Sequence, residues 1–328
     1  MSYTAESGSL GLAIQPVKGT FTAPTDYMKV RSIDLNPDGK KLIPDVEVGG
    51  VSDITDIAQG TYKISGSIDT YVRPEAIGIL MRGAMGEYTA SGTVATGAYL
   101  HNLKPASGSL PWISLKKNVS DNVQTVNYPD CKVAGFTFDI NASEYVTAKF
   151  DITGISDAIG TASVPTYESA PLLVATKATI NIQGVPVSVK SCSIEYKNNL
   201  DDGDFRVGSR FLGDITEKRR ELDIKMDVVL DTTSELYRKA FYGSASVTSA
   251  GFDVFAQSLD IWLESPTQIA TSGVYYKMLF SVKNAVFMAA PVPSSGDDLV
   301  VIPLELKATK LSGQNILDVK IWNGKTTY

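Results

Sequence analysis

Residues 29–36 read Lys29-Val30-Arg31-Ser32-Ile33-Asp34-Leu35-Asn36, and residues 190–197 read Lys190-Ser191-Cys192-Ser193-Ile194-Glu195-Tyr196-Lys197. Both stretches contain serine, isoleucine, an acid and a large apolar residue in this order, at a spacing of 161 residues. Three further pairs follow at spacings of 159 to 161: Val48-Gly49 with Val207-Gly208, Asp53-Ile54-Thr55 with Asp214-Ile215-Thr216, and Glu75 with Glu235. Four matches in one order predict an internal duplication, which decides the architecture of the whole chain.

Each repeat contains stretches in which apolar and polar residues alternate, the pattern of a half-buried strand. The first repeat predicts strands at 28–35, 62–71, 99–104, 112–116, 123–128, 132–140 and 146–153. The second predicts strands at 178–183, 186–197, 221–230, 275–289, 299–309 and 316–322. A short helix is expected in each, with Pro74 and Glu75 in the first turn of one and Asp231 before the start of the other, ending at Gly86 and Gly243. Proline and an acid suit a first helical turn.

The domain boundaries follow from composition. We expect an N-terminal arm at 1–26, a first module at 27–154, a linker at 155–172, and a second module with a C-terminal strand at 173–328. The arm is rich in Gly, Ser, Thr and Pro and has no strand period, so it is either loose or laid across a neighbour. Two long polar connections, 36–60 and 198–217, interrupt the modules, and the first contains the turn signal Pro37-Asp38-Gly39.

Four strands of each module carry one apolar and one polar face, so the fold class is mainly β with one short flanking helix per module. The polar face meets water. Exposed sheet edges pair with a neighbouring unit unless the sheet closes. Closing many such sheets into one ring removes every edge and makes a wide barrel with a polar lumen.

Composition narrows the function. The 328 residues carry a formal net charge of −6, with 43% hydrophobic and 20% charged residues, which is typical of a globular protein. A protein that grips nucleic acid normally shows a basic surplus. The basic triplet Lys218-Arg219-Arg220 is balanced by Glu217, Glu221 and Asp223, so it predicts a solvated rim or a subunit contact.

No enzyme, metal or cofactor is predicted. The single histidine, His101, has no acidic neighbour in sequence, and Cys131 and Cys192 lie far apart and predict buried, reduced thiols. The glycines of Gly83-Ala84-Met85-Gly86 lack the ending of a phosphate loop, and Asp201-Asp202-Gly203-Asp204 lacks the EF-hand spacing. Paired carboxylates for glycoside hydrolysis are not excluded, but nothing indicates them.

Targeting signals are also lacking in the expected places. The N-terminal residues have no basic region or long apolar core, as a signal peptide would. No run reaches the roughly 18 apolar residues of a membrane helix. We therefore expect a protein made in the host cytoplasm that stays soluble until it meets a partner, with no membrane contact.

In their order along the chain, these features resemble a phage tail tube protein of the two-module type. The similar stretches are Gly19-Thr20-Phe21-Thr22-Ala23-Pro24, Val30 to Leu35, Val48-Gly49-Gly50, residues 62–86, Tyr99-Leu100-His101 and Ser109-Leu110-Pro111-Trp112. The resemblance implies that each module is a β-sandwich or barrel that gives four strands to an inner wall, and that six modules close about 24 strands. A doubled subunit implies a trimeric, pseudo-hexameric ring; a hexamer is the alternative.

The resemblance also implies a function. The chain would be a structural virion protein that self-assembles into stacked rings, and the resulting tube would conduct DNA from the capsid to the host cell. The implied partners are further copies of the chain, the tape-measure protein and DNA in the lumen without sequence-specific binding, tail terminator and baseplate proteins, and, in a contractile tail, a sheath. The implied location is the tail of the virion.

The resemblance assigns roles to named residues. The lumen-facing set is Ser32, Asp34, Ser65, Ser67, Asp69, Thr147, Lys149, Asp151, Ser193, Glu195, Asp223, Lys225, Asp227, Glu305 and Lys307. Acids outnumber bases in this set, so the wall would repel passing DNA and let it slide. The alternative interpretation is that these residues form the solvated face of a sheet with no further role. The residues implied to join rings are Asp38, Lys40, Lys41, Val48, Asp53, Asp201, Asp202, Arg206 and Arg210. The alternative interpretation is that they lie in ordinary surface loops.

Two alternatives stay open. A tail terminator or baseplate ring component would cap a tube rather than extend it. A carbohydrate-binding β-sandwich would expose an aromatic platform, for which Trp112, Trp262 and Trp322 are the candidates. We expect these tryptophans in cores or subunit contacts instead.

Overall fold

The computed structural model describes residues 8–45, 49–50, 53–54, 56–119, 124–230, 256–289 and 300–328. The chain is mainly β, as predicted, and the described residues contain one α-helix, α1 (Ile77–Met85). The strands are β1 (Ser9–Gln15), β2 (Asp26–Met28), β3 (Ser32–Leu42), β4 (Ala58–Tyr71), β5 (Gly86–Ala95), β6 (Ala98–Pro105), β7 (Trp112–Val119), β8 (Gln124–Asn141), β9 (Thr147–Gly154), β10 (Ala158–Ile159), β11 (Thr179–Ile182), β12 (Val185–Val187), β13 (Val189–Lys197), β14 (Glu221–Val229), β15 (Ala256–Gln268), β16 (Tyr275–Ala289), β17 (Val301–Ala308) and β18 (Asp318–Asn323).

Eight strands in succession form one antiparallel layer, which we call the amphipathic sheet. Their order is β3, β4, β9, β8, β13, β14, β17 and the end of β16. The layer is not closed, because among the described strands β3 pairs only with β4. One edge of β3 therefore has no strand partner in the described part of the chain.

The two halves of the amphipathic sheet share one pairing order. In the first half the order is β3–β4–β9–β8, and in the second it is β13–β14–β17–β16. The halves join where β8 pairs with β13, with Phe136 opposite Tyr196 and Phe138 opposite Ile194. This junction, which we call the seam, covers the edge of β13 that corresponds to the uncovered edge of β3.

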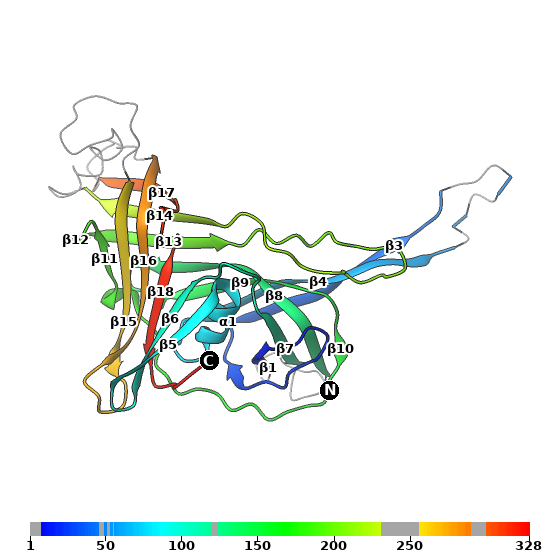
Figure 1. Ribbon diagram of the computed structural model, residues 1–328, viewed down its shortest axis with the longest axis horizontal. Helices are drawn as coiled ribbons and strands as arrows, with labels where there is room; N and C mark the ends of the chain where they lie inside the picture. The colour runs from blue at the N-terminus through cyan, green and yellow to red at the C-terminus, as the bar shows by residue number, and fades with distance from the viewer. Residues whose placement is uncertain are drawn as a thin grey trace.

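A second layer covers the apolar face of the amphipathic sheet. It contains β12, β11, β15, β16, β18, β6 and β5, paired in that order. Figure 1 shows β15, β16 and β18 crossing the direction of β13 and β14 steeply, and β16 contributes to both layers. The layers meet at Phe138 and Phe280, whose ring centroids lie 4.9 Å apart. One hydrophobic core thus extends through both halves.

The helix α1 is buried on nearly every side. Of its nine residues, only Arg82 is not buried, so the helix predicted to flank the first module is a core helix instead. Small residues permit this: a Cβ added at Gly83 would lie 2.9 Å from a methyl group of Val133. The helix ends at Gly86, as predicted, and Gly86 adopts a φ of 87° that favours glycine.

The start of α1 differs from the prediction. Pro74 and Glu75 were expected in the first turn, but the helix begins at Ile77, and no acid lies in its first turn. Instead, the N–H of Ala76 donates a hydrogen bond of 2.7 Å to Oε2 of Glu168. The carboxyl group that caps this helix therefore comes from the segment between the two halves, a contact that local sequence does not encode.

The expected N-terminal arm contains a core strand. Strand β1 pairs with β7 along its whole length and with β2 at its start. Leu10, Leu12 and Ala13 are fully buried within the same chain. Residues 9–15 therefore belong to the body of this chain.

The connection 36–60 is largely a β-ribbon. Strands β3 and β4 stay paired out to Leu42 and Ala58, and Figure 1 shows them leaving the body as a two-stranded extension. The turn predicted at Pro37-Asp38-Gly39 is wrong, because Pro37 lies inside β3, opposite Ile64. An edge strand tolerates proline, since one side of it makes no ladder hydrogen bonds.

Other elements differ in extent. The strands predicted at 123–128 and 132–140 form the single bent strand β8, and β5 and β15 were not predicted. The predicted helix at 231–243 lies outside the described residues. The final strand β18 is confirmed, and it pairs with both β16 and β6. None of the helices in the described part of the chain is long and apolar enough to cross a membrane.

Candidate functional site

The amphipathic sheet has one face that is in the core and one that is not. Apolar residues such as Leu35, Phe150, Ile194 and Leu306 are buried against the second layer. Residues at the alternate positions point the other way, because side chains alternate along a strand. We call the latter surface the polar face. It extends without interruption from β3 to β17.

All fifteen residues predicted to face a lumen lie on the polar face, and none is buried. The strand registers bring them into rows. One row runs from Ser32 through Asp69, Lys149 and Thr137 to Glu195, Asp223 and Lys307. The structure therefore assembles residues from both halves into one surface.

Carboxylates dominate the polar face. Leaving out the ribbon beyond Asn36, it carries nine acids: Asp34, Asp69, Asp139, Asp151, Glu195, Glu221, Asp223, Asp227 and Glu305. It carries four lysines: Lys149, Lys197, Lys225 and Lys307. The surplus of acids gives this surface a net negative charge.

Each lysine of the polar face has an acidic neighbour. Lys307 Nζ lies 3.2 Å from both Glu221 and Asp223, and these hydrogen bonds raise the pKa of Lys307. The hydrogen bond to Glu195 likewise raises the pKa of Lys197. A phosphate reaching this surface would have to displace such contacts, so the lysines are poor anchors for nucleic acid.

The connection 198–217, expected to join rings, lies on the first half of its own chain. Lys63 of β4 contacts Asp202 at 2.6 Å. The guanidinium of Arg210 lies 5.0 Å from the ring centroid of Tyr62, and the ring of Phe211 meets Tyr62 edge to face. Arg206 pairs with Asp204 inside the connection, and Asp201 pairs with Lys218, which directly follows it.

The first-half residues predicted to join rings lie on the ribbon or beyond its described end, apart from Val48. Asp38, Lys40 and Lys41 are exposed on β3, and Asp53 is exposed beyond it. Val48 lies outside the described residues. The ribbon also exposes Ile43 and Ile57, at 53% and 61%. Exposed apolar side chains gathered at such a projection indicate a contact surface.

A buried ion pair fastens the second-half connection to the first half. Lys132 of β8 is 2% exposed, and its Nζ donates to Glu217 and to the carbonyl of Ile215, both at 2.7 Å. The ammonium also lies 4.5 Å from the ring centroid of Trp112. Sequence reasoning missed this pair, because 85 residues separate its members and neither has a local signal.

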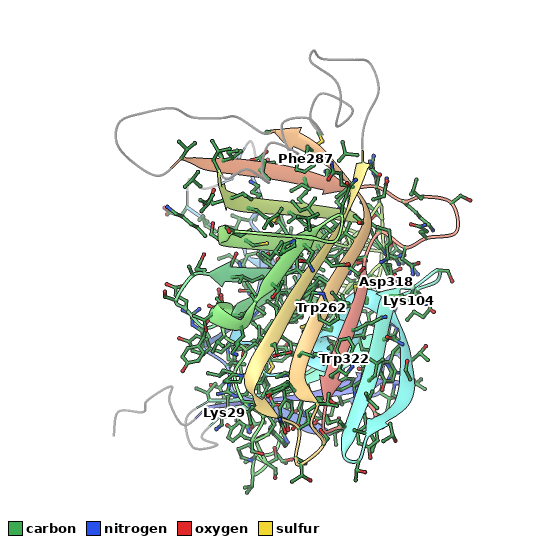
Figure 2. All side chains as sticks on the ribbon, turned by 90° about the vertical axis from the view of Figure 1, so that its left-hand side faces the viewer. Lys29, Lys104, Trp262, Phe287, Asp318 and Trp322 are labelled. Atoms are coloured by element: carbon green, nitrogen blue, oxygen red, sulfur yellow. The ribbon has the colours of Figure 1, made fainter. Side chains whose placement is uncertain are left out.

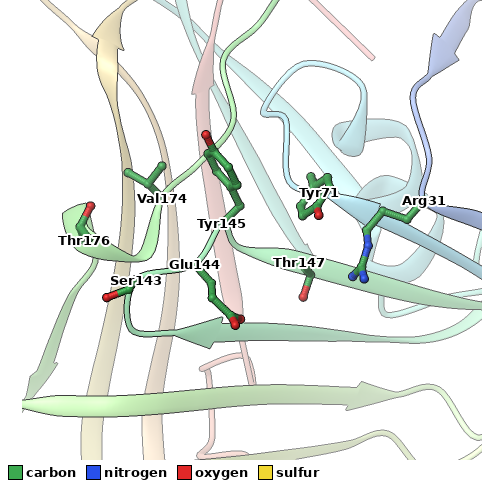
Figure 3. Close-up of a pocket in the computed structure, with 8 residues that line it drawn as sticks. All are labelled: Arg31, Tyr71, Ser143, Glu144, Tyr145, Thr147, Val174 and Thr176. Atoms are coloured by element: carbon green, nitrogen blue, oxygen red, sulfur yellow. The ribbon is translucent and has the colours of Figure 1, made fainter.

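A hollow of about 560 Å³ lies where β4 ends and β8 turns toward β9. Figure 3 shows the residues around it, which include Arg31, Tyr71, Glu144 and Tyr145. The tyrosine rings meet edge to face at 5.9 Å, and the Arg31 guanidinium lies 5.1 Å from the ring centroid of Tyr71. An arginine beside exposed tyrosines suits contact with another protein.

The histidine and the two cysteines considered as catalytic or metal-binding candidates are buried. His101 is fully buried and bonded to Tyr88 and Asn323, and burial lowers its pKa. Cys131 and Cys192 are free and buried, which raises the pKa of Cys192 to about 12. Among the described residues, no group of His, Cys, Asp and Glu could hold a metal ion.

The tryptophans do not form an open platform. Trp262 and Trp322 lie side by side on the second layer, with centroids 5.7 Å apart (Figure 2). Both are half-buried rather than in the core. Lys277 lies over both rings, with its Nζ 4.8 Å from the centroid of Trp322. Two lysines lie over Trp112 in the same way. These coverings disfavour stacking of a sugar on any of the three.

Comparison with known families gives one result that fits this surface. The family model described as phage tail tube protein matches residues 6–308. The match includes both halves of the amphipathic sheet and the seam between them. A comparison with curated proteins finds no match.

Proposed function

This chain belongs to the phage tail tube protein family, and on that premise we propose that it is the building block of a hollow tube through which DNA passes from capsid to host cell. Membership implies a structural role, association with further copies into rings, and a place in the tail of a virion. The chain acts by its shape and surface charge, without catalysis or a cofactor. It is made in the host cytoplasm before assembly.

The two halves of the amphipathic sheet are copies of one ancestral module. Their shared pairing order supports this, as do the four sequence matches at spacings of 159 to 161. Each module supplies four strands. A closed β-barrel needs every edge paired, so three chains of eight strands would close about 24 strands. A hexameric ring is the alternative.

The observation that carries the proposal is the unpaired edge of β3. Its counterpart β13 has that same edge covered by β8 of the preceding half. In a ring, the end of β16 from a neighbouring copy would cover β3 in the same way, because β16 holds the place of β8 in the pairing order. The seam is thus an internal example of the contact between copies.

The polar face would line the lumen. Its excess of carboxylates over lysines supports passage of DNA, because a negative wall repels phosphates whatever the base sequence. The ribbon, with Asp38, Lys40, Lys41, Val48 and Asp53, would reach a neighbouring ring. Asp201, Asp202, Arg206 and Arg210 would contribute from the second half. The tape-measure protein, terminator, baseplate and, in a contractile tail, a sheath complete the set of partners.

Electron microscopy of the concentrated protein tests the proposal. Stacked hollow rings with threefold symmetry are expected. Isolated rings that never stack would favour a terminator or baseplate component instead. A chain that stays monomeric at high concentration, with no ring or tube in any image, would contradict the proposal.

A further inference from the structure

A basic hollow of about 500 Å³, which we call the edge pocket, lies beside the unpaired edge of β3. Lys29, Arg31 and Lys117 line it together with apolar side chains such as Met28 and Tyr167. Its lining contains no carboxylate among the described residues. A basic surface with an apolar floor favours an acidic segment of chain.

The cations of the edge pocket are incompletely neutralised. Lys29 and Lys117 form no ion pair with a described carboxylate; Lys29 lies over the ring of Tyr167, and Lys117 donates to the carbonyl of Ile33 at 3.3 Å. Arg31 is paired with Asp69 only at 3.5 Å. Burial lowers the pKa of Lys117, and the nearby Asp34 opposes this. A further carboxylate would stabilise all three cations.

In the second half, the place that corresponds to the edge pocket is occupied by the connection between β8 and β9. Lys190 follows Lys29 by 161 residues, and its carbonyl accepts a hydrogen bond from the N–H of Ala142, at 3.0 Å. Ala142 belongs to the connection between β8 and β9. At this point of the seam the remaining space is about 280 Å³, against about 500 Å³ at the edge pocket. The β8–β9 connection therefore occupies the place that is open beside β3.

The counterpart of the β8–β9 connection is the β16–β17 connection, because β16 and β17 hold the places of β8 and β9 in the pairing order. It runs from 290 to 300, eleven residues, whereas the β8–β9 connection has five, 142–146. Its sequence includes Asp297 and Asp298 and has no lysine or arginine. Residues 290–299 lie outside the described residues.

We propose that the edge pocket of one copy binds the β16–β17 connection of a second copy, with Asp297 and Asp298 facing Lys29, Arg31 and Lys117. The proposal rests on the self-association proposed above and names the segment and charges that align the two copies. Figure 2 supports the geometry, since Lys29 and Phe287, near the two ends of the amphipathic sheet, lie on opposite sides of the chain. One copy can therefore offer its pocket and its connection to two different neighbours.

Charge exchange tests the proposal. Lys29→Glu with Lys117→Glu, and separately Asp297→Lys with Asp298→Lys, should each raise by about tenfold or more the concentration at which half the protein sediments as rings or tubes. The variant carrying all four changes should recover most of the wild-type assembly, because the pairs are again complementary. Arg31 is left unchanged, since it also contacts Asp69 and Tyr71.

A matched control is Lys104→Glu with Lys283→Glu, two exposed lysines outside the edge pocket; it should assemble like the wild type. Circular dichroism melts of the dilute monomers show that each variant folds. Unchanged assembly of the aspartate variant, or failure of the fourfold variant to recover, would overturn the proposed docking while the tube function stands. A wild-type chain that never assembles would overturn the function, and the docking with it.

Discussion

The ammonium of Lys132 donates a hydrogen bond of 2.7 Å to the carboxylate of Glu217, and this contact joins β8 to the connection that precedes β14. The lysine is 2% and the glutamate 14% exposed. Removing one member of a buried pair leaves the other charge without compensation. Separating the two halves at this point would leave a buried charge without its partner, and this cost stabilises their contact.

Lys132→Met should lower the free energy of unfolding by about 3–5 kcal/mol. The matched control is Lys225→Met, which removes an exposed pair with Glu305 at 3.8 Å and should cost about 0–1 kcal/mol. Urea denaturation followed by circular dichroism measures both. Equal losses of unfolding free energy for the two variants would show that the buried pair stabilises the fold no more than the exposed one.

The same pair predicts sensitivity to acid. Burial alone would raise the pKa of Glu217, but hydrogen bonds from Lys132 and from the N–H of Leu110 outweigh it, so the pKa is lowered. A lowered folded-state pKa gives stability that is present above the ordinary value of 4.5 and is lost as the pH falls through the folded value. Glu217→Gln should therefore lose less stability than the wild type between pH 5 and 3, measured by urea titration.

Glu168 predicts the opposite trend at higher pH. Burial raises its pKa from 4.5 to about 8, although the hydrogen bond from Ala76 opposes the rise. The native state then holds a proton that the unfolded chain releases, so stability falls as the pH rises from 4.5 to about 8. Glu168→Gln should flatten this part of the profile. Calorimetric melting temperatures from pH 5 to 9 measure it, and identical slopes would contradict the assignment.

The aromatic contact between the two layers predicts a large core effect. Phe138→Ala should cost about 3–5 kcal/mol, because it empties the space between Phe150 and Phe280. Thr137→Ala changes the neighbouring residue, which faces the polar side, and should stay within about 0.5 kcal/mol. Chemical denaturation distinguishes the two. A small loss for Phe138→Ala would mean that the layers are not coupled there.

Gly66 predicts a backbone constraint on the first strand pair. It has a φ of 153°, and a Cβ added there would lie 1.6 Å from the carbonyl oxygen of Asp34. Gly66→Ala should therefore displace β3 and cost about 3 kcal/mol or more. Gly108→Ala, where nothing lies within 4 Å of the added carbon, is the control. Comparable melting temperatures for both variants would contradict this constraint.

The charge of the polar face predicts the behaviour of DNA. Glu195→Lys with Asp227→Lys should make assembled tubes bind duplex DNA at 50 mM salt, with weaker binding at 200 mM, because phosphate contacts release counterions. Glu264→Lys with Asp318→Lys places the same charge change on the second layer and should bind less. Fluorescence anisotropy measures both. Binding that is equal for the two variants would argue against a polar-face lumen.

The alternation of apolar and polar residues predicted the polar face, because one side of each strand is apolar and the other is polar. In β14, Leu222, Ile224 and Met226 alternate with Asp223 and Lys225, so both faces could be assigned from the sequence. Strand β15 alternates as clearly, with Leu259, Ile261 and Leu263 buried, and could have been found by the same rule. Both strands, one in each layer, are thus encoded locally.

The parts that were missed depend on distant contacts. Strand β1 alternates Leu10, Leu12 and Ile14 with small or polar residues, but both of its faces are buried, so the alternation does not mark a solvent-facing side. The sequence of the ribbon predicts a loop, because Pro37 and Gly39 are typical turn residues, and only pairing with β4 makes them part of a strand. The Glu168 cap and the Lys132–Glu217 pair join residues 92 and 85 positions apart. No short window of sequence contains such pairs.

Strand β18, described above as the last strand of the chain, lies between β16 and β6. On a ribosome it emerges after the other strands that the structure describes. Until then, the edge of β6 that it will cover is unpaired, and the nascent chain offers that edge to any strand nearby. The register of the second layer is therefore completed only once β18 has emerged, and a chain truncated before residue 318 would leave this edge of β6 free to pair with a strand of another chain.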